Sequence, residues 1–253
     1  MKIGLVQYNP VWEDIEANKK EIIRLLKEFN SSVDLLIFPE LTLTGFTMNP
    51  DKFFSDLESG NVGFFSALAK ERNTNIVFGD IIKDDDNLFN TLLLLDRNGD
   101  LIKHYHKIHP FSYGDENKHY SAGKDTVIAE IDGVKTGFTI CYDLRFPELY
   151  RFYGKERVEL IINIANWPIT RIHHWKTLLK ARAIENQAFV AAVNRTGNDP
   201  QLIYNGCSSV YDPMGDELCC IDKEVKIQLV ETDLEFVGKV RKKFSFLEDI
   251  KLI

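Results

Sequence analysis

The stretch VKTGFTICYDLRFPELYR, residues 134–151, joins an apolar run to a single cysteine and a polar cluster. The apolar run, Thr136–Ile140, is typical of a buried strand. Cys141 ends this run, and Pro147 lies near the first turn of an expected helix, where the missing N–H of proline has no cost. A strand, a thiol, a tight turn and a helix start together indicate a nucleophile elbow, whose backbone N–H groups can point at a developing oxyanion.

The composition suits one large globular domain, expected to span residues 1–253, or at most two small ones. Of the 253 residues, 44% are hydrophobic and 27% are charged, and the formal net charge is -7. This length and this hydrophobic content are enough for a substantial core. The negative net charge differs from the basic footprint of nucleic-acid-binding proteins, so no nucleic-acid partner is expected.

Neither a membrane span, a disulfide nor a metal site is expected. Every apolar run falls short of the roughly 18 residues that span a bilayer, and the N-terminus lacks the long apolar segment of a signal peptide. The four cysteines, at positions 141, 207, 219 and 220, form no CxxC pair. A chain of this size also has no need of disulfides. We therefore expect a reduced, cytoplasmic protein without a zinc site.

Strands and helices alternate along the chain. Lys2–Tyr8 alternates as a strand does, Asp14 can cap a following helix, and Val33–Phe38 is a short buried strand. This order suggests a parallel pair of strands with a crossover. Further strands are expected at 75–82, 88–95, 101–107, 126–131, 134–140, 159–164, 188–193, 203–211, 217–221 and 226–233, with helices near 63–72, after residue 141, near 172–183 and up to about 243, and a loop at 109–124. One sheet would need too many strands, so the pattern predicts two sheets covered by helices, an α+β fold.

Cys141 is the candidate nucleophile. An isolated buried cysteine is as often a small hydrophobic residue as a reactive one. Cys141, however, ends an apolar strand beside Tyr142, Asp143 and Arg145, so its side chain can face a cleft. A thiol that acts as a nucleophile needs a base or a positive charge nearby.

Glu40 is a candidate for that base. It follows the buried run Leu35–Phe38 and Pro39. A carboxylate just past the end of an interior strand can enter a cleft and act as a general base. The alternatives are a solvated loop acid or the cap of a following helix, although the apolar residues around Glu40 disfavour full solvation.

Lys107 ends an expected strand. A lysine at such a position is most often solvated, and the alternative is an ammonium that stabilises an oxyanion. The neighbouring His104, His106 and His109 raise the question of a metal, but no carboxylate or cysteine accompanies them at ligand spacing. Glu116 lies in the loop at 109–124 and is, by its position alone, one acid among several.

Three separated motifs resemble those of the nitrilase, or carbon–nitrogen hydrolase, superfamily. They are FPEL at 38–41, HKIH at 106–109 and ICYDLRFP at 140–147. Their order and spacing match the Glu, Lys and Cys of the family, and the resemblance runs from the first residue to about residue 247. Three motifs in register are far more specific than any one alone.

The resemblance implies a four-layer α-β-β-α sandwich, with two mixed sheets between helix layers, that pairs through a helical face into a homodimer. It implies that Glu40 is the general base, Lys107 the oxyanion lysine and Cys141 the nucleophile. Glu116 matches the second glutamate, which orients the lysine and the substrate, and the backbone N–H of Tyr142 matches the second oxyanion donor. The implied reaction is a cofactor-free amide hydrolysis through a thioester.

The stretch 166–195 looks like the omega-amidase branch of this family. That branch deamidates 2-oxoglutaramate and similar omega-amides of 2-oxo dicarboxylic acids. Such a substrate carries a carboxylate, which Arg145 or Arg171 is expected to bind, because arginine suits bidentate carboxylate recognition. Both arginines have structural alternatives: Arg145 could pair with Asp143 or Glu148, and Arg171 could lie on a helix surface.

The remaining pocket candidates are an amide and three aromatic residues. Asn166 and Trp167 follow the strand that comes after the Cys141 helix, so their side chains are expected to reach the same sheet edge. Phe46, Phe111 and Trp167 are candidates for apolar walls, although such aromatics are more often part of the core.

Two other functions stay open. One is a different branch of the same superfamily, an N-carbamoyl amide hydrolase or a nitrilase. The other is a non-catalytic binding protein that keeps the fold, which the intact Glu40, Lys107 and Cys141 disfavour.

Overall fold

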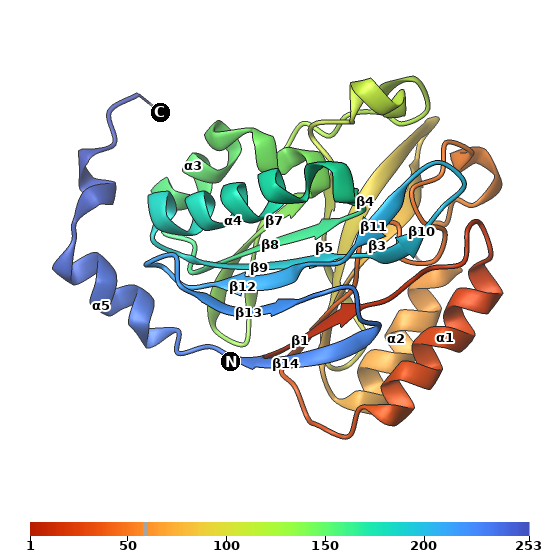
Figure 1. Ribbon diagram of the computed structural model, residues 1–253, viewed down its shortest axis with the longest axis horizontal. Helices are drawn as coiled ribbons and strands as arrows, with labels where there is room; N and C mark the ends of the chain where they lie inside the picture. Colours follow the sequence, from red (N-terminus) through yellow and green to blue (C-terminus); the bar gives the residue numbers. More distant parts are fainter. Residues whose placement is uncertain (58–59, 253) are drawn as a thin grey trace.

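Two six-stranded sheets lie between two layers of helices (Figure 1). The structure is a computed structural model that describes residues 1–57 and 60–252. The helices are α1 (Ile15–Glu28), α2 (Asn61–Arg72), α3 (Pro147–Lys155), α4 (Ile172–Asn186) and α5 (Glu235–Lys243). The strands are β1 (Lys2–Gln7), β2 (Leu35–Ile37), β3 (Asn75–Asp84), β4 (Asn87–Leu95), β5 (Leu101–His106), β6 (Ile128–Ile131), β7 (Val134–Ile140), β8 (Leu160–Ala165), β9 (Phe189–Asn194), β10 (Thr196–Asn198), β11 (Ile203–Asn205), β12 (Ser208–Tyr211), β13 (Glu217–Ile221) and β14 (Lys226–Glu231).

The four layers follow the order α-β-β-α. The first sheet has the strand order β14-β1-β2-β3-β4-β5, and the second has the order β13-β12-β9-β8-β7-β6. Helices α1 and α2 cover the outer face of the first sheet, and α3 and α4 cover that of the second (Figure 1). The predicted sandwich is confirmed. Within the described residues, no helix is long and apolar enough to cross a membrane.

The first sheet grows from the predicted parallel unit β1-α1-β2. Asp14 caps α1, since its side chain accepts a hydrogen bond of 3.0 Å from the backbone N–H of Ala17. β1 pairs in parallel with β2, and β2 pairs in parallel with β3. β14, β4 and β5 add antiparallel pairs, so the sheet is mixed as predicted.

The second sheet joins three parallel strands, β7, β8 and β9, to the antiparallel β6, β12 and β13. The prediction of one strand over 203–211 is wrong. Gly206 and Cys207 adopt positive φ angles of 69° and 61°, which interrupt a strand, so the chain forms β11 and β12 instead. β11 pairs with β10 in a two-stranded ribbon that the sequence did not predict.

The predicted loop at 109–124 is more regular than expected. It contains two short 3-10 helices, Ser112–Gly114 and Glu116–Lys118. Local bonds such as His119 N–H to Glu116 O, at 3.0 Å, hold these turns. The segment around Glu116 therefore has a defined backbone, which a site residue requires.

An apolar core fills the space between the two sheets. Leu5, Ile37 and Val77 of the first sheet and Phe138 and Ile162 of the second belong to one cluster and are fully buried. A second cluster packs α1 and α2 against the first sheet. The inner faces of both sheets are thus held together by hydrophobic burial, which fixes the strand ends relative to one another.

The strands that precede the candidate residues end at one edge of the sandwich. Parallel strands present their carboxyl ends at the same edge of a sheet. Glu40 follows β2 and Lys107 follows β5 in the first sheet, while Cys141 follows β7 and Asn166 follows β8 in the second. The backbone N–H of Asn166 donates to Oε2 of Glu40 at 2.8 Å, so the two sheets meet at this edge.

Candidate active site

Cys141 lies just after β7 in a left-handed backbone conformation, with a φ of 46°. Residues with a side chain seldom adopt this conformation, and such strain gathers at functional sites. A 3-10 helix follows over Cys141–Arg145, and Pro147 is the first residue of α3. The predicted strand, tight turn and helix start are confirmed.

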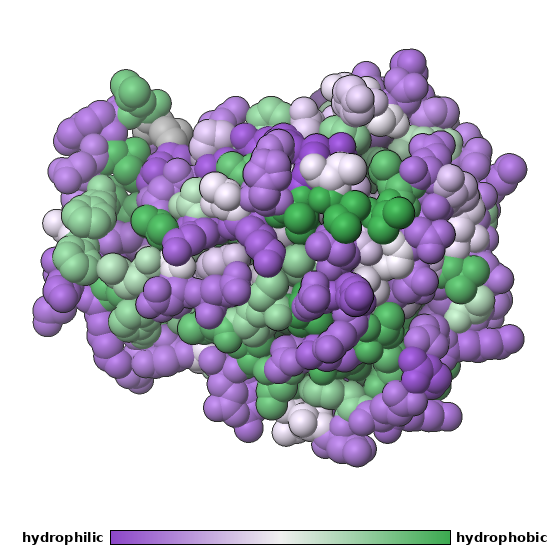
Figure 2. All heavy atoms as spheres, in the orientation of Figure 1, coloured by the Kyte–Doolittle hydropathy of each residue, from purple (hydrophilic) through white to green (hydrophobic). Residues whose placement is uncertain are grey.

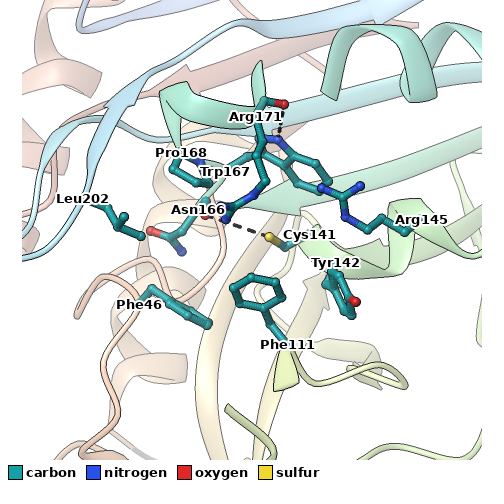
Figure 3. Close-up of a pocket in the computed structure, with 10 residues that line it drawn as sticks. All are labelled: Phe46, Phe111, Cys141, Tyr142, Arg145, Asn166, Trp167, Pro168, Arg171 and Leu202. Carbon is teal, nitrogen blue, oxygen red and sulfur yellow. Dashed lines mark hydrogen bonds between the residues drawn. The ribbon is translucent and has the colours of Figure 1, made fainter. Parts of the chain in front are cut away.

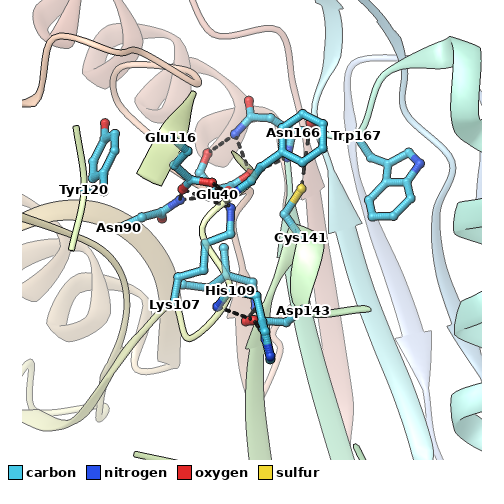
Figure 4. Close-up of polar contacts among 12 residues, drawn as sticks. Glu40, Asn90, Lys107, His109, Glu116, Tyr120, Cys141, Asp143, Asn166 and Trp167 are labelled. Atoms are coloured by element: carbon cyan, nitrogen blue, oxygen red, sulfur yellow. Dashed lines mark hydrogen bonds and ion pairs between the residues drawn. The ribbon is translucent and has the colours of Figure 1, made fainter. Parts of the chain in front are cut away.

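Glu40, Lys107 and Glu116 form a buried charged cluster (Figure 4). Nζ of Lys107 lies 2.7 Å from Oε1 of Glu40, 3.0 Å from Oε1 of Glu116 and 2.9 Å from its Oε2. None of the three residues is more than 1% exposed. Three side chains from separate segments thus converge on one point, and the ammonium is shared by both carboxylates.

Asn90 completes this cluster, although the sequence did not predict it. Its Nδ2 donates to Oε1 of Glu40 at 2.7 Å and to Oε1 of Glu116 at 2.8 Å. Asn90 lies inside β4 rather than after a strand. The sequence around it carries no signal of this role, because only the pairing of β4 with its neighbours brings it to Glu40.

Asn166 holds Glu40 from the second sheet. In addition to its backbone N–H, its Nδ2 donates to the backbone oxygen of Glu40 at 2.8 Å and to Oε2 at 3.2 Å. Its backbone oxygen lies 4.0 Å from Sγ of Cys141. Asn166 was predicted as a substrate-binding residue. It does line the pocket, but its amide nitrogen is already bonded to Glu40.

Burial and the charges of the cluster shift the pKa values of its members. Burial, together with the negative charge of Glu40, raises the pKa of the Cys141 thiol well above its usual value. Burial also raises the pKa of Glu116, against the opposing effect of Lys107. Burial by itself would lower the pKa of Lys107, but Glu116 and Glu40 raise it well above its usual value. The lysine is therefore a cation, and the resting cysteine is a neutral thiol.

A pocket opens above Cys141 (Figure 3). It brings together all the residues predicted to bind substrate. It also includes Pro168 and Leu202, which the sequence analysis did not single out. Leu202 comes from the turn between β10 and β11. The residues that line the pocket are Phe46, Phe111, Cys141, Tyr142, Arg145, Asn166, Trp167, Pro168, Arg171 and Leu202.

Two arginines lie at the pocket wall, each against an aromatic ring. The guanidinium of Arg145 lies 4.9 Å from the ring centroid of Trp167, and that of Arg171 lies 5.4 Å from the ring centroid of Phe111. Burial, and then the positive charge of Arg171, lower the pKa of Arg145. Two neighbouring cations over apolar rings form a site that an anionic group would stabilise.

Arg145 does not take the structural role with Asp143 that the sequence left open. Its Nη2 lies 3.2 Å from Nδ1 of His174. Both carboxylate oxygens of Asp143 are instead occupied by other donors, among them Nδ1 of His109 at 2.7 Å. The side chain of Arg171 lines the pocket with its guanidinium over the ring of Phe111, and its backbone oxygen accepts a 2.8 Å bond from Nε1 of Trp167.

Tyr142 directly follows Cys141, and its role as an oxyanion donor stays a prediction. It is the second residue of the 3-10 helix that starts at Cys141. Backbone N–H groups in the first turn of a helix have no partner within the helix. The N–H of Tyr142 lies in such a first turn, next to the thiol. Its ring packs edge-on against Phe111 and Phe146.

The histidines beside Lys107 are held by local contacts. The rings of His104 and His106 lie 4.9 Å apart between centroids, and Nδ1 of His106 lies 2.8 Å from Oγ1 of Thr91. Over residues 1–57 and 60–252, no group of three or more His, Cys, Asp or Glu side chains is arranged to hold a metal ion.

Comparison with curated proteins finds relatives along nearly the whole chain. A 2-oxoglutaramate amidase of Bacillus subtilis (strain 168) is 34% identical over 251 residues, which cover 98% of this chain and 97% of that protein. The omega-amidase YafV of Escherichia coli (strain K12) is 34% identical over 252 residues, which cover 98% of this chain and 96% of that protein.

A solved structure and a family model also match nearly the whole chain. XC1258 from Xanthomonas campestris, a CN-hydrolase superfamily protein with an arsenic adduct in its active site, superimposes with a TM-score of 0.94 at 33% identity. The match covers 100% of this chain and 98% of that one. The model of the carbon-nitrogen hydrolase family matches residues 2–242. The chain therefore belongs to the carbon-nitrogen hydrolase family, whose members hydrolyse carbon–nitrogen bonds other than peptide bonds.

Proposed function

We propose that the protein is an omega-amidase, which hydrolyses the omega-amide of small 2-oxo dicarboxylic acid monoamides such as 2-oxoglutaramate to the acid and ammonia. One observation carries the proposal. The Cys141 thiol lies in a pocket between the Glu40–Lys107 pair below and two arginines at the wall. The relatives named 2-oxoglutaramate amidase and omega-amidase support the same substrate class.

The first half of the reaction needs a base at the moment of attack, because the resting Cys141 is a neutral thiol. Glu40 takes the thiol proton while Sγ forms a bond to the amide carbon. The carbonyl oxygen gains the negative charge. Nζ of Lys107 and the backbone N–H of Tyr142 stabilise that oxyanion, in a buried site where such contacts act strongly.

The second half releases the two products. Protonated Glu40 gives its proton to the leaving nitrogen, the carbon–nitrogen bond breaks, and ammonia departs from a thioester on Cys141. The same carboxylate then takes a proton from water, which attacks the thioester and frees the acid. Glu116 and Asn90 hold Lys107 and Glu40 in place through both halves.

Substrate recognition is assigned to the pocket wall. The carboxylate of the substrate pairs with Arg145 and Arg171, which both line the pocket, and no carboxylate is among the described residues that line it. Phe46, Phe111 and Trp167 enclose the carbon chain.

Product analysis tests the proposal against the other branches of the family. The purified protein is incubated with 2-oxoglutaramate, with N-carbamoyl compounds and with nitriles, and ammonia and carbon dioxide are measured. We expect ammonia without carbon dioxide, and fastest from the omega-amide. Carbon dioxide release from a carbamoyl compound at a higher kcat/KM would favour the N-carbamoyl branch. No hydrolysis of any of these compounds would favour a binding protein.

A homodimer formed through the face of α3 and α4 is part of the proposal. Ile184 on α4 and Phe246 beyond α5 are large hydrophobic residues with 45% and 63% exposure. Figure 2 shows hydrophobic side chains along the C-terminal segment at the left of the view. Exposed apolar surface of this kind is typical of an interface, and a second copy would cover it. Sedimentation of the wild type at the dimer mass, and of Ile184→Glu at the monomer mass, is the expected result.

We also propose a reduced, cytoplasmic location. The four cysteines are free thiols, which suits a reducing compartment. Oxidation of Cys141 would remove the nucleophile. Fractionation of cells that express the protein, with detection by antibody, tests the location.

A further inference from the structure

A fully buried carboxylate joins the Cys141 turn to the lysine segment, and neither the mechanism nor the pocket uses it. Asp143 is 0% exposed, and its two oxygens accept four hydrogen bonds. Figure 4 shows its contact with His109. Burying a carboxylate costs much free energy unless its oxygens are bonded, so an arrangement this complete fixes the groups that donate to it.

On one side, Asp143 holds the turn that carries the thiol. Its Oδ2 accepts a 2.9 Å bond from the backbone N–H of Ile140, the residue directly before Cys141. Its backbone oxygen accepts a 3.0 Å bond from the N–H of Phe146, where the turn ends. Asp143 therefore accepts hydrogen bonds from both ends of the turn, and between these ends lies Cys141 with its strained φ.

On the other side, Asp143 holds the segment that carries the lysine. The hydroxyl of Tyr105 donates to its Oδ2 at 2.8 Å, and the backbone N–H and Nδ1 of His109 lie 3.1 and 2.7 Å from its Oδ1. Tyr105 and His109 are each two residues from Lys107. The Asp143 carboxylate thus forms hydrogen bonds with the lysine segment on both sides of Lys107.

Phe146 adds a second link between the two segments. Its ring stacks on that of His109, with centroids 3.7 Å apart and an angle of 6° between the planes. The thiol turn and the lysine segment come from facing sheets, so nothing in the backbone hydrogen-bond ladders sets the distance between them.

We propose that Asp143 is a positioning residue that sets the place of the Lys107 ammonium relative to the Cys141 turn and so completes the oxyanion site. The inference rests on the catalytic roles proposed above for Lys107, Cys141 and the N–H of Tyr142. An oxyanion must lie within bonding distance of two donors while its carbon bonds to sulfur. A misplacement of about 1 Å can cost roughly 100-fold in rate.

Two probes separate the thiol from the oxyanion site. An aliphatic aldehyde adds reversibly to the Cys141 thiol. A carbon–sulfur bond forms, the carbonyl π bond breaks, and the thiol proton is transferred to the oxygen. That oxygen occupies the oxyanion site. Iodoacetamide alkylates the same thiol with loss of iodide and a proton, and needs no oxyanion site. Calorimetry measures the affinity for the aldehyde, and mass spectrometry of the Cys141 peptide measures the rate of alkylation.

Asp143→Asn and Tyr105→Phe are the test variants. The asparagine places a donor where two donors already point, so we expect kcat to fall by about 100-fold while KM changes by less than about threefold. Aldehyde affinity falls by a similar factor. Tyr105→Phe removes one hydroxyl from the lysine side, so kcat and aldehyde affinity fall by about tenfold. Alkylation of Cys141 in Tyr105→Phe stays within about threefold of the wild-type rate, because the thiol turn keeps its own bonds to Asp143.

Tyr153→Phe is the matched control. It also removes a buried tyrosine hydroxyl, whose 2.7 Å bond goes to the backbone oxygen of Phe138 in β7 rather than to Asp143. We expect its kcat and aldehyde affinity to match the wild type. An equal loss in Tyr153→Phe and Tyr105→Phe would mean that the effect is general destabilisation, and would overturn the proposal.

The proposal also fails if folded Asp143→Asn keeps wild-type aldehyde affinity, or if its KM rises while kcat holds. Where Asp143→Asn does not fold, Tyr105→Phe decides. Aldehydes with and without a terminal carboxylate are both used. If the wild type turns over no 2-oxo acid amide, the proposed function falls, but the comparison of aldehyde affinity with alkylation still tests Asp143.

Discussion

Nζ of Lys107 lies 2.7 Å from Oε1 of Glu40 and 2.9 Å from Oε2 of Glu116, so one buried ammonium balances two buried carboxylates. Burial raises the pKa of Glu116 against the opposing effect of Lys107, and burial together with the charge of Glu40 raises that of the Cys141 thiol. The lysine therefore serves both stability and chemistry.

Replacing Lys107 with Met should lower both the stability and the activity of the protein. Without the ammonium, Glu40 and Glu116 face each other buried and unpaired, and breaking a buried pair in this way costs about 3–5 kcal/mol of unfolding free energy. Ammonia release should be lost as well. Adding Glu116→Gln to Lys107→Met should restore much of the stability, as measured by urea unfolding, but no activity. Recovery of activity in the double variant would contradict the oxyanion role of Lys107.

Cys141→Ala should abolish ammonia release from 2-oxoglutaramate while the fold survives. The mutation removes a small buried side chain and the only proposed nucleophile, so we expect a cost to stability of no more than about 1 to 2 kcal/mol. Circular dichroism and ammonia release measure the two effects. Cys219→Ala, on the edge strand β13, is the matched control and should keep wild-type kcat/KM. Unchanged turnover in Cys141→Ala would rule out the assigned nucleophile.

Arg145→Met and Arg171→Met should each raise the KM for 2-oxoglutaramate. A hydrogen bond to a charged group contributes about 1.5–3 kcal/mol, which corresponds to a rise of roughly 10- to 100-fold. The kcat/KM for pentanamide, which has no carboxylate, should change little, because neither arginine touches the reacting carbon.

Arg151→Met is the control for these variants. Its Nη2 lies 3.7 Å from Oε2 of Glu185, away from the pocket, so its kinetics should match the wild type. A parallel loss on 2-oxoglutaramate and pentanamide in the Arg145 and Arg171 variants would show that the arginines support the pocket wall rather than bind a carboxylate.

Two of the predicted site residues, Glu40 and Cys141, come after strands that are visible as short hydrophobic stretches. Lys107 follows a strand of mixed polar and apolar residues, and Glu116 lies in a loop, so the roles expected for these two depended on the family resemblance. Asn90 escaped prediction because it lies within a strand and reaches Glu40 only through the pairing of β4 with β3 and β5.

Asp143 escaped prediction for a different reason. It lies within the cysteine motif, but its partners Tyr105 and His109 are 38 and 34 residues away. The nearer charge, Arg145, was the more obvious partner on the sequence. Spacing along the sequence favours a partner that is close in the chain. It cannot identify a distant partner whose contact depends on how two sheets face each other. The break at Gly206 and Cys207 was missed because an isolated glycine inside a strand pattern suggests a bulge or a close backbone approach and does not by itself predict that the strand ends.

Asp80 should make stability depend on pH. It lies on β3 under α2, and Nδ2 of Asn61 donates to its Oδ1 at 3.2 Å. Burial raises the pKa of Asp80 to about 7, and hydrogen bonds from the Ile81 backbone and Asn61 oppose the rise only in part. An unfolded aspartate has a pKa of about 3.9. Between these two values the folded state binds the extra proton, so the free energy of unfolding falls as pH rises from about 4 to about 7.

Asp80→Asn cannot ionise, so it should lose this dependence. Each unit of pKa difference corresponds to about 1.4 kcal/mol, so the variant should gain up to about 4 kcal/mol over the wild type as pH rises through the window, and the gain should level off above pH 7. Urea unfolding at half-unit steps from pH 4.5 to 8 measures it. Asp51→Asn, at an exposed position, controls for the loss of one negative charge. A difference between Asp80→Asn and wild type that stays constant across this range would mean that Asp80 is ionised in the folded protein throughout, held by donors stronger than the bond from Asn61.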